Sequence, residues 1–213
     1  MRTNGIFLQL RSLNRYIDIS FIAKFIGLFL LFYYTNIFFV QLTLPGKWHS
    51  DFFSNNLNYV QWLTDSLTHM SGYIANLLGV ENYVKTETNS IVSATNGRGV
   101  IVKWECIGLG IYSFWLAFIL AHKMNIKRKI LFSISGLILM WLLNCIRIAL
   151  LLYGIEHNLK AWKKSWKFIG NVNHHDLYNY VCYILIIGMI YFYYRRTTKK
   201  TATLKVNSEQ NKS

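Results

Sequence analysis

The stretch ILFSISGLILMWLLNCIRIALLLY, which begins at Ile130 and ends at Tyr153, decides the fold class of this chain. It carries one charged residue, Arg147, and it exceeds the roughly 20 apolar residues that an α-helix needs to cross a bilayer. A soluble domain does not normally bury a run of this length and composition. The sequence therefore predicts an integral membrane protein.

Three further runs are similarly poor in charge, and each predicts another membrane span. They cover residues 20–42, 105–121 and 177–194. No small-residue cleavage site follows the first run, so we expect it to remain as a span rather than to be removed as a signal peptide. The expected fold class is thus an all-α integral membrane protein, built as a small bundle of about four transmembrane helices.

The distribution of charge predicts the topology. The net charge is +14, and 14 of the 23 Lys and Arg residues fall in residues 1–24, 122–129 and 195–213. Such an excess of basic residues marks the cytoplasmic side. We expect a cytoplasmic segment at 1–19, a membrane domain at 20–194 and a basic, disordered cytoplasmic tail at 195–213. No nucleic-acid-binding motif accompanies the charge, so we expect no nucleic-acid partner.

Two segments predict amphipathic helices on the outer side. Residues 47–81 contain Asp51, Asp65 and several asparagines, which disfavour a span, yet their apolar residues recur at helical spacing. These apolar residues are Val60, Leu63, Leu67, Met70, Ile74 and Leu78. We expect this helix on the outer surface or folded against the bundle; two short re-entrant segments would keep the same topology, and one full crossing would reverse it. Residues 154–176 interleave lysine with tryptophan, which is typical of an interfacial helix on lipid headgroups.

A short β-hairpin is predicted on the outer side in residues 90–104. Two β-branched runs flank Asn96-Gly97, and both turn residues tolerate positive φ. This hairpin would lead the chain directly into Cys106. The alternative is a plain surface loop.

Three chemically reactive residue types fall near the same end of three spans. Cys106 opens the second run, Arg147 lies about six residues, or roughly 9 Å, below the outer end of the third, and His174 and His175 precede the fourth. With a cytoplasmic N-terminus, all of them lie on the outer side. A thiol, a fixed cation and an imidazole are the parts of a nucleophilic active site, and a neighbouring cation stabilises the thiolate.

Each of these residues also has a plainer structural explanation. A lone cysteine in a membrane segment usually packs, an arginine near a helix end can reach the headgroups, and a histidine at a boundary is commonly interfacial. Asn144 lies one turn before Arg147 and can hydrogen-bond inward, while Gly108 would let another chain approach closely. His157 and Asp176 have no tight ligand spacing, so we expect no metal site and no cofactor.

The pattern as a whole resembles the exosortase/archaeosortase family of membrane-embedded cysteine transpeptidases. The resemblance rests on an Asn-Gly turn, then Cys106-x-Gly108, then Asn144-x-x-Arg147-Ile148, and a histidine at the start of the last span. It covers about residues 96–192. The family implies a Cys–Arg–His site at the outer face of the cytoplasmic membrane. That site cleaves the C-terminal sorting signal of exported proteins, which consists of a short motif, a transmembrane helix and a basic cluster.

The resemblance also implies a role for each residue. Cys106 would be the acyl-thioester nucleophile, Arg147 would stabilise the developing charge, and His175 would move the proton, with His174 as the alternative. The chain departs from the family pattern in two places: Ile107 stands where Ser or Ala is usual, and Asn179 stands where a glycine often follows the histidine.

Two other functions remain open from the residues. A non-enzymatic transporter or assembly subunit would use Arg147 to bind an anionic ligand or a partner helix, and Cys106 would then be dispensable. A histidine-dependent membrane acyltransferase is a third option, but the usual His-x-x-x-x-Asp arrangement is missing near a membrane boundary.

Overall fold

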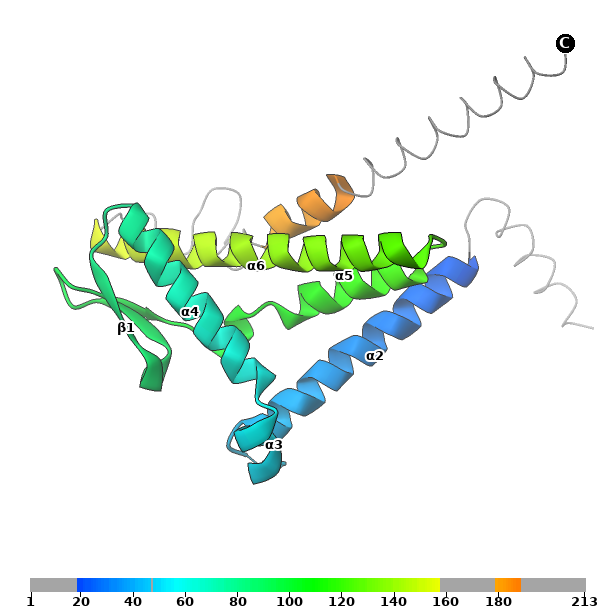
Figure 1. Ribbon diagram of the computed structural model, residues 1–213, viewed down its shortest axis with the longest axis horizontal. Coiled ribbons are helices and arrows are strands. Elements are labelled where there is room, and N and C mark those ends of the chain that lie inside the picture. The colour runs from blue at the N-terminus through cyan, green and yellow to red at the C-terminus, as the bar shows by residue number, and fades with distance from the viewer. Residues whose placement is uncertain (1–18, 47, 158–178, 189–213) are drawn as a thin grey trace, which may run out of the picture. The chain divides into compact units, whose positions relative to one another are not determined.

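The computed structural model describes residues 19–46, 48–157 and 179–188, and it separates into two units, Met1–Lys164 and Ser165–Ser213 (Figure 1). The described part of the second unit is one short apolar helix, Asn179–Gly188. The first unit holds α2 (Ile19–Thr43), α3 (Asp51–Asn56), α4 (Tyr59–Leu77), β1 (Asn82–Lys85), β2 (Ser90–Ser93), β3 (Gly99–Ile101), α5 (Leu109–Ala121) and α6 (Ile126–Glu156). Two 3₁₀ turns, Thr86–Thr88 and Trp104–Cys106, complete it.

Three helical segments are long and apolar enough to cross a membrane, which confirms the predicted class. They are Ile19–Thr43, Trp104–Ala121 and Ile126–Glu156. Helix α6 begins before the predicted residue 130 because Asn125 caps it, with its side-chain oxygen accepting from the Lys127 N–H at 3.3 Å. Of the predicted fourth span, the described residues include only Asn179–Gly188.

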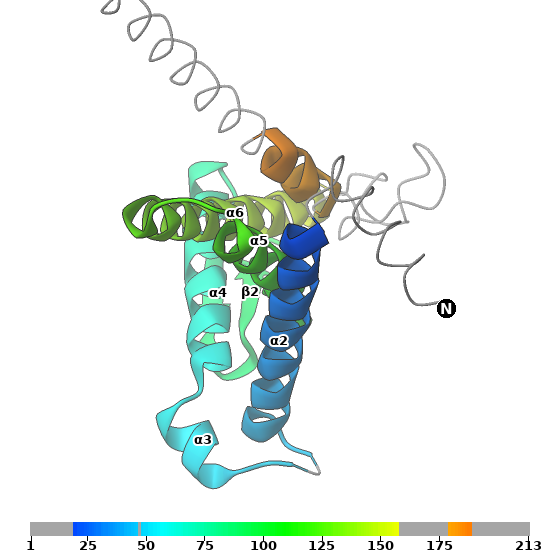
Figure 2. The ribbon, with the colours of Figure 1, turned by 90° about the vertical axis from the view of Figure 1, so that its right-hand side faces the viewer.

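Helix α5 packs against α2 on one side and α6 on the other (Figures 1 and 2). Phenylalanine rings join α2 to α5, with Phe25 and Phe114 edge to face at 5.1 Å. Gly136 of α6 lies against the Trp115 ring of α5, where a β-carbon would come within 2.1 Å of the indole nitrogen. The two antiparallel helices therefore approach closely, as small residues permit in membranes.

The predicted amphipathic helix is confirmed as α4, which packs against α6 and the sheet. Its Asn58 cap accepts from the Gln61 N–H at 2.9 Å. Of the apolar residues that predicted this helix, Val60 and Leu67 are buried, whereas Leu63 is half-buried and Leu78 is exposed. The buried residues are mostly small or hydroxylated: Val60, Thr64, Leu67, Thr68, Ser71, Gly72 and Ala75. Close packing selects small side chains, which hydropathy spacing alone does not detect.

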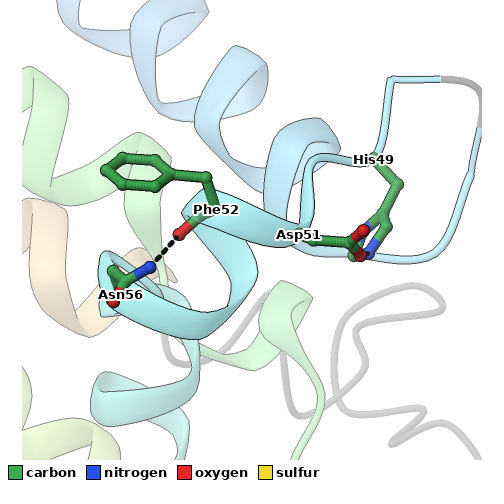
Figure 3. A network of polar contacts seen from close by, with 4 residues as sticks. All are labelled: His49, Asp51, Phe52 and Asn56. Atoms are coloured by element: carbon green, nitrogen blue, oxygen red, sulfur yellow. Dashed lines mark hydrogen bonds and ion pairs between the residues drawn. The ribbon is translucent and has the colours of Figure 1, made fainter.

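A single turn of helix, α3, precedes α4 and is largely exposed. His49 Nε2 lies 3.2 Å from the Asp51 carboxylate at its start, and the Asn56 amide donates to the Phe52 carbonyl oxygen at 3.0 Å (Figure 3). The segment between residues 47 and 81 thus forms two helices rather than one.

The predicted hairpin is confirmed as β2 and β3, which pair antiparallel with Ile91 opposite Val100. Of the turn pair, only Gly97 adopts positive φ, at 68°. The structure adds a strand that was not predicted, β1, so the sheet has the order β1-β2-β3. It lies beside α4, near the C-terminal end of α6 (Figure 1).

Candidate functional site

Cys106 ends the 3₁₀ turn between β3 and α5, where the residue is partly exposed. Its N–H donates to the Lys103 carbonyl oxygen at 2.9 Å, and the following Ile107 is fully buried. Gly108 then caps α5 with φ 85° and ψ 33°, a left-handed conformation that costs other residues energy. Gly108 is therefore required for the sharp turn that leads from Cys106 into α5.

Asn144 of α6 holds the backbone of this turn. Its side chain is fully buried, and its Nδ2 donates to the carbonyl oxygens of Cys106 at 2.7 Å and Ile107 at 3.1 Å. Its Oδ1 accepts from Arg147 Nε at 3.1 Å. One buried amide thus links the reactive turn to the arginine one helical turn away.

Arg147 reaches the same backbone directly, since its Nη2 lies 3.4 Å from the Cys106 carbonyl oxygen. Its side chain is half-buried, between the exposed surface and the packed core. The structure therefore brings Cys106 together with Asn144 and Arg147, which follow it by 38 and 41 residues and lie on the neighbouring helix α6.

The imidazole of the predicted triad falls outside the description, because His174 and His175 lie within the gap at residues 158–178. His157 caps α6, and its ring lies at a tilt against that of Tyr153, with ring centroids 4.3 Å apart. Within the described residues, no group of His, Cys, Asp and Glu side chains could hold a metal ion.

The chemistry available here is that of a nucleophile beside a fixed cation. Cys106 precedes the N-terminus of α5, where unpaired N–H groups carry partial positive charge, and Arg147 adds a full positive charge. The guanidinium can also donate hydrogen bonds to an oxygen that gains negative charge in a reaction.

A largely apolar cavity of about 360 Å³ is lined by residues of α2, α4, α5 and α6, and no sequence pattern indicated it. Asn36 of α2, Tyr59 of α4 and Ser113 of α5 form its polar wall: Tyr59 donates to Asn36 at 2.8 Å and Asn36 to Ser113 at 3.1 Å. Burial raises the pKa of the Tyr59 phenol. Its remaining lining residues are Leu63, Leu109, Tyr112, Leu116, Leu137, Ile138 and Trp141.

A second polar contact that the sequence did not indicate joins Ser93 of β2 to Glu156 at the end of α6. The only sequence feature that could have indicated it is an acidic residue, Glu156, at the end of a long apolar run, and this feature does not predict which residue it contacts.

Comparison with known proteins places the chain in a family. No curated protein and no solved structure matches the chain. The family model described as transmembrane exosortase matches residues 9–193, which is most of the 213-residue chain and includes the whole of the site. The chain therefore belongs to the transmembrane exosortase family.

Proposed function

We propose that this protein is a membrane-embedded cysteine protease or transpeptidase. It cleaves the C-terminal sorting signal of exported proteins at the outer face of the cytoplasmic membrane. The observation that carries the proposal is the hydrogen-bonded cluster of Cys106, Asn144 and Arg147. Cys106 is partly exposed, and its backbone carbonyl oxygen accepts hydrogen bonds from Asn144 and from the Arg147 guanidinium.

In the first step, the Cys106 thiolate attacks the scissile carbonyl carbon of the substrate. The C–S bond forms, and Arg147 stabilises the oxyanion of the tetrahedral intermediate. The C–N bond then breaks, and the leaving amine takes a proton from an acid, a role that we assign to His175. Arg147 acts by hydrogen bonding rather than by donating its proton, because a guanidinium stays protonated in proteins.

In the second step, water or an amine or hydroxyl of a surface acceptor attacks the thioester. The C–S bond breaks and the thiolate of Cys106 returns, while His175 accepts the proton of the attacking group. Water would give hydrolysis, and another acceptor would give transpeptidation.

Charge supports the outer location. The basic residues 122–129 join the C-terminal end of α5 to the N-terminal end of α6. Cys106 and Arg147 lie near the other ends of these two helices. If that loop faces the cytoplasm, as the positive-inside rule favours, the site lies on the outer side. The apolar cavity beside Leu109 and Trp141 would then face the transmembrane part of the sorting signal.

The test replaces Cys106 with Ala or Ser and follows the size of tagged exported proteins that end in a motif, one span and a basic cluster. We expect processing to stop in both variants and to continue in Cys182→Ala, the matched control that also removes one thiol. Normal processing by Cys106→Ala would refute an acyl-thioester mechanism.

A further inference from the structure

Helix α6 holds the segment that carries Cys106 at a second place, far from Asn144. The Ser93 hydroxyl, which is 1% exposed, donates to the Glu156 carboxylate in the last turn of α6. A hydrogen bond to a charged group is among the stronger polar contacts in a protein. It joins the sheet to the helix that carries Arg147.

Ser93 is also the residue around which the hairpin turn is built. Its hydroxyl oxygen accepts from the N–H groups of Thr95 at 3.2 Å and Asn96 at 3.4 Å. Its own N–H donates to the Arg98 carbonyl oxygen at 2.8 Å. The contact with Glu156 therefore restrains the whole turn and not one side chain alone.

From this turn, a continuous set of backbone hydrogen bonds leads to Cys106. Strand β3 pairs with β2 up to Ile101, opposite Ser90. The next residue, Val102, is buried and donates to the Asn89 carbonyl oxygen at 2.8 Å. Lys103 then accepts from the Cys106 N–H at 2.9 Å. Hydrogen bonds therefore restrain the backbone at several points between the Glu156 contact and Cys106.

We propose that Ser93 and Glu156 are positioning residues for the reaction at Cys106. Glu156 and Asn144 hold the Cys106 segment at two points of α6 that are about 18 Å apart along its axis. Asn144 and Arg147 hold the segment at Cys106, and the distant contact at Glu156 limits its rotation about that point. The contact thereby sets the distance between the thiol and Arg147.

The activity part of the test rests on the proposed function and compares Glu156→Leu and Ser93→Ala with Glu156→Gln. The glutamine retains an oxygen that accepts from Ser93, and leucine does not. We expect kcat to fall about tenfold or more in Glu156→Leu and Ser93→Ala with KM nearly unchanged, because small displacements of reacting groups are costly. Glu156→Gln should stay close to the wild type. Glu87→Leu, at an exposed turn of the same sheet, is the matched control.

A second readout needs no substrate, so its result stands even if the proposed function fails. The alkylation rate of Cys106 by iodoacetamide, measured site by site by mass spectrometry, should change about threefold or more in Glu156→Leu and Ser93→Ala and recover in Glu156→Gln. The double variant should add nothing to either single change.

Thermal unfolding of each variant separates positioning from stability. If the kcat and the alkylation rate per folded molecule equal those of the wild type in Ser93→Ala and Glu156→Leu, the proposal is overturned, whatever happens to the melting temperature. If Glu156→Leu does not fold, Ser93→Ala, which removes only a hydroxyl group, decides alone. If the wild type processes no substrate but the alkylation rate of Cys106 still changes in Ser93→Ala and Glu156→Leu, the proposed function is refuted and the positioning role is supported.

Discussion

Asn144 and Cys106 are joined by a 2.7 Å hydrogen bond from the Nδ2 of the buried amide to the carbonyl oxygen of the thiol residue. The bond connects α6 to the turn that begins α5. The Oδ1 of the same amide accepts from Arg147 Nε, so one buried side chain positions both the guanidinium and the backbone of Cys106. The geometry of the site therefore depends on a residue that need not touch the substrate.

Replacement of Asn144 by Leu should destabilise the protein. The carbonyl oxygens of Cys106 and Ile107 would lose the Asn144 donor, Cys106 would keep only the longer contact with Arg147, and a buried acceptor left unpaired costs about 1–3 kcal/mol. Unfolding in detergent, followed by circular dichroism, measures the free energy of unfolding. Asn56→Ala removes a similar amide–carbonyl bond at an exposed site and should change little. Equal stability of the two variants would show that the Asn144 amide is not structurally important.

Replacement of Arg147 by Lys should abolish turnover while the protein stays folded. Arg147 donates to Asn144 and Cys106 through different nitrogens of a planar fork, and a lysine ammonium cannot reproduce that geometry. Loss of one such stabilising donor costs about 10²- to 10³-fold in kcat. Arg128→Lys, in the basic loop, is the control. Wild-type turnover by Arg147→Lys would reduce Arg147 to a generic cation.

Replacement of Gly108 by Ala should impair both stability and activity. The φ of 85° costs an L-residue about 1–2 kcal/mol, and relief of that strain would move Cys106, two residues earlier. Gly27→Ala is the matched control, because a β-carbon at Gly27 meets nothing within 4 Å and lies in a regular helix. Comparison of melting temperature and processing rate checks both effects. Indistinguishable results for the two alanine variants would contradict the strained turn.

The protein should lose stability as the pH falls below about 6.5. The pKa of His122 is lowered from 6.5, first by burial and second by the charge of Lys129. Since the unfolded state then binds a proton more readily than the folded state, the contribution of His122 is complete above pH 6.5 and declines as the pH falls toward the lowered pKa.

Melting temperatures between pH 8 and pH 5 test this dependence. The His122 ring stacks on Phe118 at 5.8 Å, so His122→Phe keeps a ring in place but removes the proton site. Its melting temperature should vary less with pH than that of the wild type. An equal pH dependence in both proteins would assign the effect to other groups.

Hydropathy and turn chemistry were sufficient to predict much of the fold. The charge-poor runs predicted the helices now seen as α2, α5 and α6, and the Asn96-Gly97 pair predicted the β2–β3 hairpin. Strand β1 was missed because no Asn-Gly pair joins it to β2; the connection is the 3₁₀ turn Thr86–Thr88 followed by Asn89 with φ 46°. The apolar spacing predicted that α4 is a helix, but it did not indicate that Thr64 and Thr68, whose hydroxyl groups donate to carbonyl oxygens within the helix, are buried.

The candidate site was only partly predictable. Asn144 and Arg147 share a helix face by their spacing, and the order of the spans predicted that Cys106 would lie near them. The carbonyl contacts of Asn144 depend on the left-handed Gly108, which the sequence suggested only as a place of close approach. The contact between Ser93 and Glu156 depends on how the sheet packs on α6, and no local pattern specifies that.

The central claim is that Cys106 carries the substrate as a thioester. The most direct measurement mixes the protein with a tagged substrate, stops the reaction with acid and maps the adduct by peptide mass spectrometry. The account predicts the N-terminal substrate fragment on Cys106, released by hydroxylamine and absent from Cys106→Ala. Substrate cleavage at the wild-type rate without any hydroxylamine-labile adduct on Cys106 would contradict it.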